Sequence, residues 1–347
     1  MKLNSNLMKT MIISTMIIST SISTFASTGI EKPSLTLSQA INRAITSCDK
    51  KTVYSRYAEA YEEINKYNKD LFSQSYRSSK LKQETYDYYM KYINAKVAYD
   101  TTDTYLSVIS LNKQIEMCNN NLDIAEKELN QVAIKKSKGM ASELEYKEAQ
   151  NQVNTAKTTK TKLEKALENE KNEFHNLTNM VITNYELEDE FTLEPLSNEN
   201  ITSYYFDKKL EEYYGLKEEQ ISIGQIGLKV LDDSTLGDYM LKEANLVSDQ
   251  YTLDDLKETM GTTLMSYYNN LDGYKADVET YDIKLKSARN KLNAQEIKYN
   301  NGFISKLEYE KALLTVQQLE DERFDKIKTY LVTKMIIEEP NILAMSN

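Results

Sequence analysis

The sequence predicts an all-α protein built from elongated coiled-coil helical hairpins in two tandem structural repeats, with little or no β-strand. The 347 residues include only three prolines and nine glycines, and such scarcity of helix breakers favours long helices. Apolar residues recur at alternating spacings of three and four, as in coiled coils. One stretch occurs twice, at 128–149 and at 291–312, with an offset of 163 residues that sets Gly302 on Gly139.

Each copy of the repeated stretch predicts the tip of a helical hairpin. The glycine follows a lysine-bearing helical run, and glycine commonly ends a helix because it has no Cβ to oppose a positive φ. The serine can cap the next helix while the glutamate reaches back, which is a capping box. The residues in this pattern are Gly139, Ser142 and Glu145 in the first copy and Gly302, Ser305 and Glu308 in the second.

Residues 1–26 predict a signal peptide. Lys2 and Lys9 precede a short apolar stretch, and small residues stand three and one before a cut after Ala26. The stretch is too short and too rich in Ser and Thr to span a bilayer. No cysteine follows the cut, so a lipoprotein anchor is not indicated. We expect export across the cytoplasmic membrane, to the cell envelope or the cell surface.

Composition argues against several classes of function. The formal net charge is −10 without a dense Lys/Arg cluster, which disfavours a nucleic-acid partner. Cys48 and Cys118 could pair in an exported protein, but both lie in helical patterns and we favour free thiols. His175, the only histidine, is interpreted as structural. No catalytic constellation, metal site or cofactor site is visible, so an enzyme is the least favoured class.

The first repeat, 27–180, is expected to begin with a helix at Leu35–Ile45, capped by Thr36 or Ser38, that runs on toward Leu71. The polar segment Ser73–Glu84 weakens the pattern, which resumes at 86–99. Asp100–Asp103 is expected to loosen it again.

From Tyr105 onward a heptad pattern marks the buried side of the arm that ascends to the first tip, and its positions recur in the second repeat. The nine positions in the first copy are Tyr105, Val108, Leu111, Ile115, Cys118, Leu122, Ala125, Leu129 and Val132, and eight of their nine partners are apolar or aromatic. Alanine at a buried position of this kind, such as Leu122 or Leu285, should cost about 2–5 kcal/mol.

The two return arms carry polar interruptions at heptad positions, namely Lys160, Glu170, Arg323 and Lys326. They fit a device that sets the register of the coiled coil, or a side chain that reaches water along its stem. They also fit a second, less apolar face that meets neighbouring chains or a lumen. The first interpretation is preferred residue by residue.

Residues 181–250 predict a connector with short helices. Tyr185–Asn200 should be extended, and Tyr204–Tyr214 should form a short helix ended by Gly215. Ile221–Val230 fits a strand or a helix, and we favour the helix. Tyr251–Leu256 should start the first long arm of the second repeat, 251–347.

Three features together resemble the TolC family of outer membrane efflux proteins, over nearly the whole mature chain. The chain opens with Leu-Thr-Leu-Ser-Gln-Ala-Ile at 35–41, and both tips read Gly-x-x-Ser-x-Leu-Glu. Asn-Leu-Thr-Asn-Met at 176–180, followed by Leu-Glu-Pro-Leu at 193–196, is similar to that family's join between repeats.

The resemblance implies a homotrimer whose helices form a hollow α-barrel. It also implies that the hairpin tips dock to a membrane-fusion adaptor, which serves an inner-membrane or ABC-type pump. Carried over position by position, the docking residues would be Gly139, Ser142, Leu144, Gly302, Ser305 and Leu307.

The chain departs from the family in one respect. Outer-membrane members contribute β-barrel strands where this sequence has 71–104 and 216–263, and strands of that kind alternate in polarity over about 9–11 residues. Four such strands are not found here. We therefore expect a version lacking the barrel strands, placed in the outer membrane only if such strands exist. A version on the outside of a single-membrane cell would fit.

Two functions from different classes follow. The first is a TolC-like component of an export or efflux conduit. The alternative is an exported coiled-coil scaffold or spacer protein of the cell envelope, with no transport lumen. A membrane-fusion adaptor is disfavoured, because it needs lipoyl-type β halves around a single hairpin.

Overall fold

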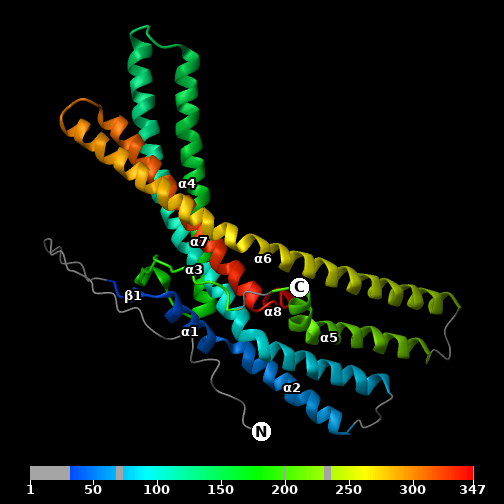
Figure 1. The fold of residues 1–347 in the computed structure, drawn as a ribbon. Helices are drawn as coiled ribbons and strands as arrows, with labels where there is room; N and C mark the ends of the chain where they lie inside the picture. Colours follow the sequence, from blue (N-terminus) through cyan, green and yellow to red (C-terminus); the bar gives the residue numbers. More distant parts are fainter. Residues whose placement is uncertain (1–31, 68–72, 198–200, 230–235, 347) are drawn as a thin grey trace. The chain divides into compact units, whose positions relative to one another are not determined.

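The computed structural model describes residues 32–67, 73–197, 201–229 and 236–346, and the predicted signal peptide lies outside these residues. The described chain is helical apart from two short strands and irregular connections (Figure 1). In chain order its elements are β1 (Ser34–Leu35), α1 (Leu37–Ser47), α2 (Asp49–Tyr67), α3 (Gln74–Ser137), α4 (Glu143–Thr178), the short 3₁₀ helix η1 (Ile182–Asn184), β2 (Glu186–Leu187), α5 (Ser203–Lys229), α6 (Leu236–Asn300), α7 (Lys306–Glu338) and α8 (Asn341–Ala344).

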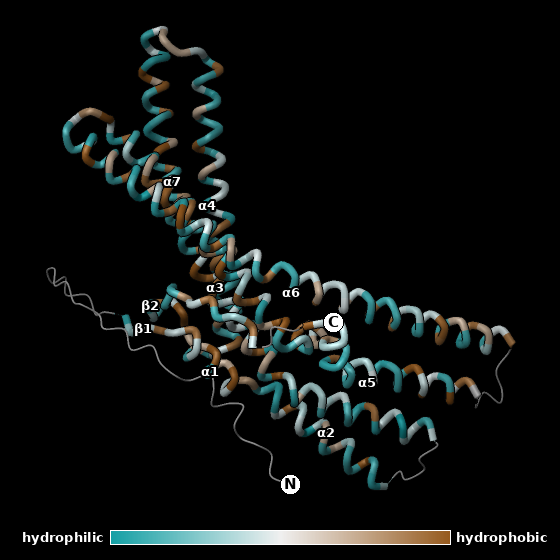
Figure 2. Tube along the Cα trace, viewed as in Figure 1, coloured by the Kyte–Doolittle hydropathy of each residue, from teal (hydrophilic) through white to brown (hydrophobic). Residues whose placement is uncertain are grey.

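The two long hairpins are α3–α4 and α6–α7, which confirms the all-α fold with two hairpin repeats. Each of the nine predicted heptad positions, in both copies, is buried or half-buried. Figure 2 shows hydrophobic residues collected where α3, α4 and α7 lie together. None of the helices in the described part of the chain has an apolar stretch long enough to cross a membrane.

The first helix does not run on as predicted. Thr36 caps α1 in a full capping box with Gln39, but the helix stops at Cys48, whose backbone is extended. α1 packs on α3 and also against the end of α4, where Arg43 Nε donates to the Thr178 carbonyl (3.2 Å), whereas α2 packs along α3. The break at Cys48 lets the chain leave α4 and continue along α3.

The polar segments that were expected to weaken the next helix are continuous parts of α3. Ser73 caps it by accepting from the Tyr76 N–H (3.2 Å). Arg77 is paired with Glu219 of α5, so its charge is satisfied between helices. Thr101 and Thr102 are buried, and their hydroxyls donate to carbonyls one turn back, at 2.7 and 2.8 Å. Periodicity alone did not reveal these partners.

The segment between the hairpins is more helical than predicted. Gly215 does not end a helix, because α5 continues through it to Lys229, and the helical interpretation of 221–229 is confirmed. α6 begins at Leu236 rather than at Tyr251. The expected extended connector holds β2, which pairs in parallel with β1. Residues 73–104, 216–229 and 236–263 are helical, as the sequence predicted in place of strands.

The polar interruptions of the second return arm are paired across its own hairpin. Arg323 Nε lies 2.6 Å from Asp282 Oδ1, and Lys326 Nζ lies 3.0 Å from Asp277 Oδ2. Both carboxylates come from α6. This pairing supports the interpretation that these residues set the register of α6 and α7.

The two hairpins meet along α3 and α7. Lys127 of α3 pairs with Glu310 of α7 (Nζ to Oε1, 2.6 Å), and Glu128 pairs with Lys311. Nearer the middle of α3, Asn120 Nδ2 donates to Gln317 Oε1 of α7 at 2.9 Å. These polar contacts fix how one hairpin lies on the other.

Asp321 lies in the same α3–α7 contact with only 8% of its surface exposed, and its Oδ1 accepts no hydrogen bond. Burial, together with the charge of the nearby Asp325, raises the pKa of this carboxyl to about 6, although a hydrogen bond from the Gln114 amide opposes the shift. A carboxylate buried in this way destabilises the folded protein at neutral pH, where it must carry its charge away from water.

We predict that Leu285→Ala lowers the free energy of unfolding by about 2–4 kcal/mol. Leu285 is 4% exposed, whereas its repeat equivalent Leu122 is half-buried. Leu122→Ala should therefore cost only about 1 kcal/mol. Urea unfolding of the two matched variants checks the difference, and equal costs would contradict the burial described here.

We also predict that Asp321→Asn stabilises the protein at pH 7.5 but not at pH 4. The folded pKa lies above the ordinary aspartate value, so the folded state holds the proton more tightly than the unfolded chain. The protonated Asp321 carboxyl therefore contributes to the stability of the fold. This contribution is fully present below about pH 4 and is lost as the pH rises through about 6. The gain at pH 7.5 should be about 1–3 kcal/mol. Denaturant midpoints at both pH values measure it, with the exposed Asp249→Asn as control. An equal effect of Asp321→Asn at both pH values would refute the prediction.

Candidate docking site at the hairpin tips

The first tip lies between α3 and α4 and has a defined backbone motif. Gly139 adopts φ +70°, in the left-handed region. Its N–H donates to the Lys136 carbonyl (2.9 Å), and the Met140 N–H donates to the Lys135 carbonyl (2.8 Å). This is the Schellman motif, which satisfies the last free carbonyls of a helix.

The second tip, between α6 and α7, repeats the motif atom for atom. Gly302 has φ +75°. Its N–H donates to the Tyr299 carbonyl (2.9 Å), and the Phe303 N–H donates to the Lys298 carbonyl (2.9 Å). The two bends therefore have matching backbone surroundings, as the repeated sequence predicted.

Both return helices begin with the predicted capping box. The Ser142 hydroxyl accepts from the Glu145 N–H (3.1 Å), while the Ser142 N–H donates to the Glu145 carboxylate (2.6 Å). Ser305 and Glu308 make the same pair of bonds, at 3.2 and 2.8 Å. These bonds to the serine backbone and hydroxyl hold the pKa of each glutamate below its usual range.

Side chains between the arms brace each turn. At the first tip, Lys136 Nζ lies 2.5 Å from Glu143 Oε2 and 4.3 Å from the ring centre of Tyr146. At the second, Tyr299 and Tyr309 stack with ring centres 5.5 Å apart. Each tip is thus joined across its two helices as well as through the backbone.

Apolar side chains remain uncovered on these braced turns. Met140 is 73% exposed and Phe303 is 80% exposed, although the residue after a Schellman glycine often packs back onto its helix. Ile134 and its equivalent Ile297 are exposed on the arms just below. Hydrophobic residues at the tip of the α6–α7 hairpin are visible in Figure 2.

The six residues singled out from the sequence do not play equal parts. The glycines and serines build the turns. Leu144 is exposed beside the first tip, while its equivalent Leu307 is half-buried. Sequence reasoning missed Met140 and Phe303. The sequence did carry a signal for them, because an apolar residue directly follows the tip glycine in each copy of the repeat.

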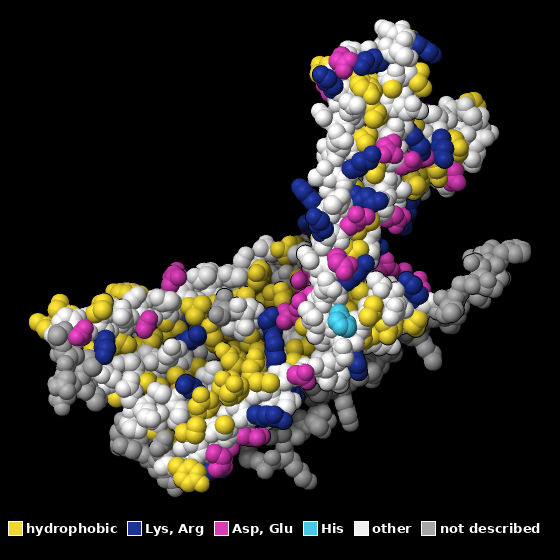
Figure 3. Space-filling model, turned by 180° about the vertical axis from the view of Figure 1, so that it is seen from behind, with side chains coloured by type: hydrophobic (Ala, Val, Ile, Leu, Met, Phe, Trp, Pro, Cys, Tyr) yellow, Lys and Arg dark blue, Asp and Glu magenta, His cyan; other side chains and the backbone are white. Residues whose placement is uncertain are grey.

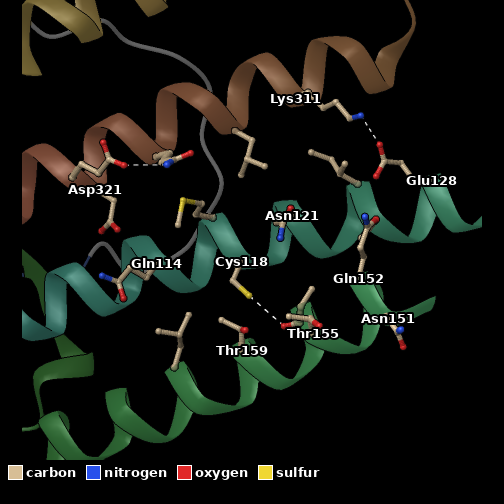
Figure 4. A pocket seen from close by; sticks show the side chains of 18 residues that line it. Gln114, Cys118, Asn121, Glu128, Asn151, Gln152, Thr155, Thr159, Lys311 and Asp321 are labelled. Carbon is tan, nitrogen blue, oxygen red and sulfur yellow. Dashed lines mark hydrogen bonds and ion pairs between the residues drawn. The ribbon is translucent and has the colours of Figure 1, made fainter. Parts of the chain in front are cut away.

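A groove of about 910 Å³ lies along α3 with α4 on one side and α7 on the other (Figure 4). Cys118 borders it, and its thiol lies 3.5 Å from the Ala156 carbonyl. The ion pair of Glu128 and Lys311 spans the groove near one end. The lining mixes apolar side chains with amides and hydroxyls and contains no histidine.

The structure places both cysteines and the histidine outside the hairpin tips. Cys48 and Cys118 are free thiols. His175 is exposed (Figure 3), and its Nδ1 lies 3.2 Å from the Met180 carbonyl just after α4. Within the described residues, no three His, Cys, Asp or Glu side chains are grouped so that they could hold a metal ion.

No protein-family model and no curated protein sequence matches the chain. Solved structures do resemble it. The CmeC outer membrane channel of Campylobacter jejuni has a TM-score of 0.61 at 11% identity, over 88% of this chain and 85% of that one. The MtrE outer membrane channel of Neisseria gonorrhoeae in its open state has a TM-score of 0.53 at 10% identity, over 87% and 88%. The outer membrane protein VceC of Vibrio cholerae has a TM-score of 0.50 at 10% identity, over 86% and 95%. The chain therefore has the helical protomer fold shared with TolC-like outer membrane channels.

Proposed function

We propose that this protein is a TolC-like component of an export or efflux conduit that docks through its two hairpin tips to a membrane-fusion adaptor. The observation that carries the proposal is the pair of matching, braced turns that expose apolar side chains. The likeness to outer membrane channels supports the conduit at the level of the fold.

The tips have the features of a protein-binding surface. An interface typically has an apolar anchor at its centre and a polar rim. Met140 and Phe303 provide such anchors, and the exposed Lys138, Glu143 and Lys306 lie within three residues of them in the sequence. Because the turns are held by backbone bonds, capping boxes and side-chain pairs, little flexibility would be lost on docking.

The contact between the hairpins fits the same role. The Lys127–Glu310 and Glu128–Lys311 pairs join α3 to α7 near the tips. They hold one hairpin against the other below the tips, and the two tips project separately (Figure 1), so each tip offers its own contact to a partner. A purely structural spacer has no need for two matching tips with uncovered apolar side chains.

In this proposal the chain is exported to the cell envelope, assembles as a homotrimer around a lumen, and receives cargo from an inner-membrane or ABC-type pump through the adaptor. The competing scaffold function has no lumen and no adaptor. A stable monomer in light scattering would favour the scaffold.

We predict that the double variant Gly139→Val/Gly302→Val weakens binding of the purified chain to its membrane-fusion adaptor by at least tenfold. A β-branched residue at φ near +70° costs about 1–3 kcal/mol per site, so the turns must rearrange. Surface plasmon resonance measures the affinity. Gly273→Val is the control, because Gly273 lies inside α6 with open space around its Cβ position.

A second variant keeps the turns intact. Met140→Asp/Phe303→Asp leaves both glycines and both capping boxes in place but should also abolish adaptor binding, because charge replaces the apolar anchors. The matched control is Ile283→Asp, at an exposed isoleucine of α6 away from the tip. If the tip variants bind the adaptor as well as the Ile283 variant does, docking through the tips is wrong.

A further inference from the structure

The groove of about 910 Å³ along α3 is built by both hairpins (Figure 4). α3 and α4 of the first hairpin line two of its sides, and α7 of the second hairpin lines the third. Its volume falls within the range of about 300–1,000 Å³ that is usual for small-molecule sites. None of the candidate docking residues at the tips lines it. The groove is therefore a place for a ligand apart from the docking site described above.

One end of the groove is acidic and has no base to balance it. Asp321 and Glu322 of α7 both line this end, and Asp321 is only 8% exposed. Asp321 Oδ1 accepts no hydrogen bond, while the half-buried Glu322 accepts one from the Gln318 amide (3.0 Å). Lys113 is near enough to influence Asp321, but it is paired with Asp189 (2.6 Å). Among the described residues, no ion pair neutralises either carboxylate of the groove end.

The rest of the groove has a different character. Near the opposite end, Glu128 is neutralised by Lys311 (Figure 4). Between the two ends lie the apolar side chains of Met117, Ile124, Ala125, Ala156 and Leu314. The groove thus joins an unbalanced negative end to an apolar stretch, and a ligand that complements it has a cationic head and an apolar tail.

The state of Asp321 narrows the chemistry of the head. A buried carboxylate oxygen without a partner destabilises the protein, and an N–H group that carries positive charge supplies both the missing donor and the missing charge. A hydroxyl would supply only the donor, and a quaternary ammonium only the charge. A metal ion would need further ligands, and no three His, Cys, Asp or Glu side chains of the described residues are grouped to hold one. The site therefore suits a protonated amine.

We propose that this groove binds an amphipathic primary ammonium compound. Its ammonium group lies against Asp321 and Glu322, and its apolar tail lies along α3 between α4 and α7. A ligand placed in this way contacts both hairpins at once. The inference goes beyond the proposed function, because it needs neither an adaptor nor a lumen.

The first test compares ligands that share one tail. Octylammonium is titrated into the purified full-length chain at pH 7.5 by isothermal titration calorimetry. The amine is protonated there, because its pKa is close to that of a lysine side chain, about 10.4. Octylammonium should bind at least tenfold more tightly than octanol or octyltrimethylammonium. No binding of octylammonium, or equal binding of octanol, would overturn the proposal.

Asp321→Asn tests the carboxylate. The substitution keeps the shape of the side chain and removes its charge, so octylammonium should bind at least tenfold more weakly while the affinity for octanol stays the same. Because this variant is expected to be more stable than the natural chain at pH 7.5, unfolding would not explain the loss. The matched control is Asp255→Asn, at an exposed acid of α6 away from the groove. An unchanged affinity of the Asp321 variant for octylammonium would refute the site.

A second pair of variants tests the groove itself. Thr159 and Thr158 are neighbouring exposed residues of α4, but only Thr159 lines the groove. Thr159→Trp should fill the groove from its rim and weaken octylammonium binding at least fivefold, whereas Thr158→Trp should leave it unchanged. If both tryptophan variants bind octylammonium equally well, the amine binds outside the groove and the proposal is wrong. A chain that binds octylammonium but not the adaptor would count against the proposed function alone.

Discussion

The structure depends on the burial of α3, which runs unbroken from Gln74 to Ser137 and packs against a different neighbour on each side. Toward the tip its heptad positions are covered by α4. Along its lower part it lies between α2 and α5, and α7 lies along it from Asp103 to Glu128. Because one helix spans both regions, the apolar contacts of α3 with α2 and α5 also fix where the first tip lies. Among the described residues, α6 packs mainly against α7 in its hairpin and against α5 along its lower part.

This difference between the two copies of the repeat is the most informative feature of the molecule. Tyr88 and Tyr251 are the same residue type at the same repeat position, yet one is buried and the other is largely exposed. Tyr88 stacks on Tyr213 of α5, whereas Tyr251 is 72% exposed. The tips have the opposite character. There the two copies match in backbone geometry, and both leave apolar side chains exposed.

The ion pairs contribute more to how the helices are aligned than to the overall stability of the fold. Most ion pairs here are at least partly exposed, and exposed pairs contribute about 0–1 kcal/mol. Their positions matter more than their strength, because Lys127 and Lys311 link the hairpins while Arg323 and Lys326 pair within one hairpin. Asp321 is the exception, since its burial costs stability at neutral pH. It sits among the contacts that join α3 to α7.

Local sequence by itself determined the helical fold, the duplicated hairpins, the heptad positions and the geometry of both tips, because each depends on residues within about one helical turn. Only the tertiary structure decided that the helix breaks at Cys48, that 73–84 and 100–103 stay helical, and that Gly215 lies inside a helix. Those outcomes depend on partners far along the chain, such as Glu219 for Arg77. The exposure of Met140, Phe303 and Tyr251 also needed the structure, because a helical pattern shows which side of a helix is apolar but not which neighbour covers it.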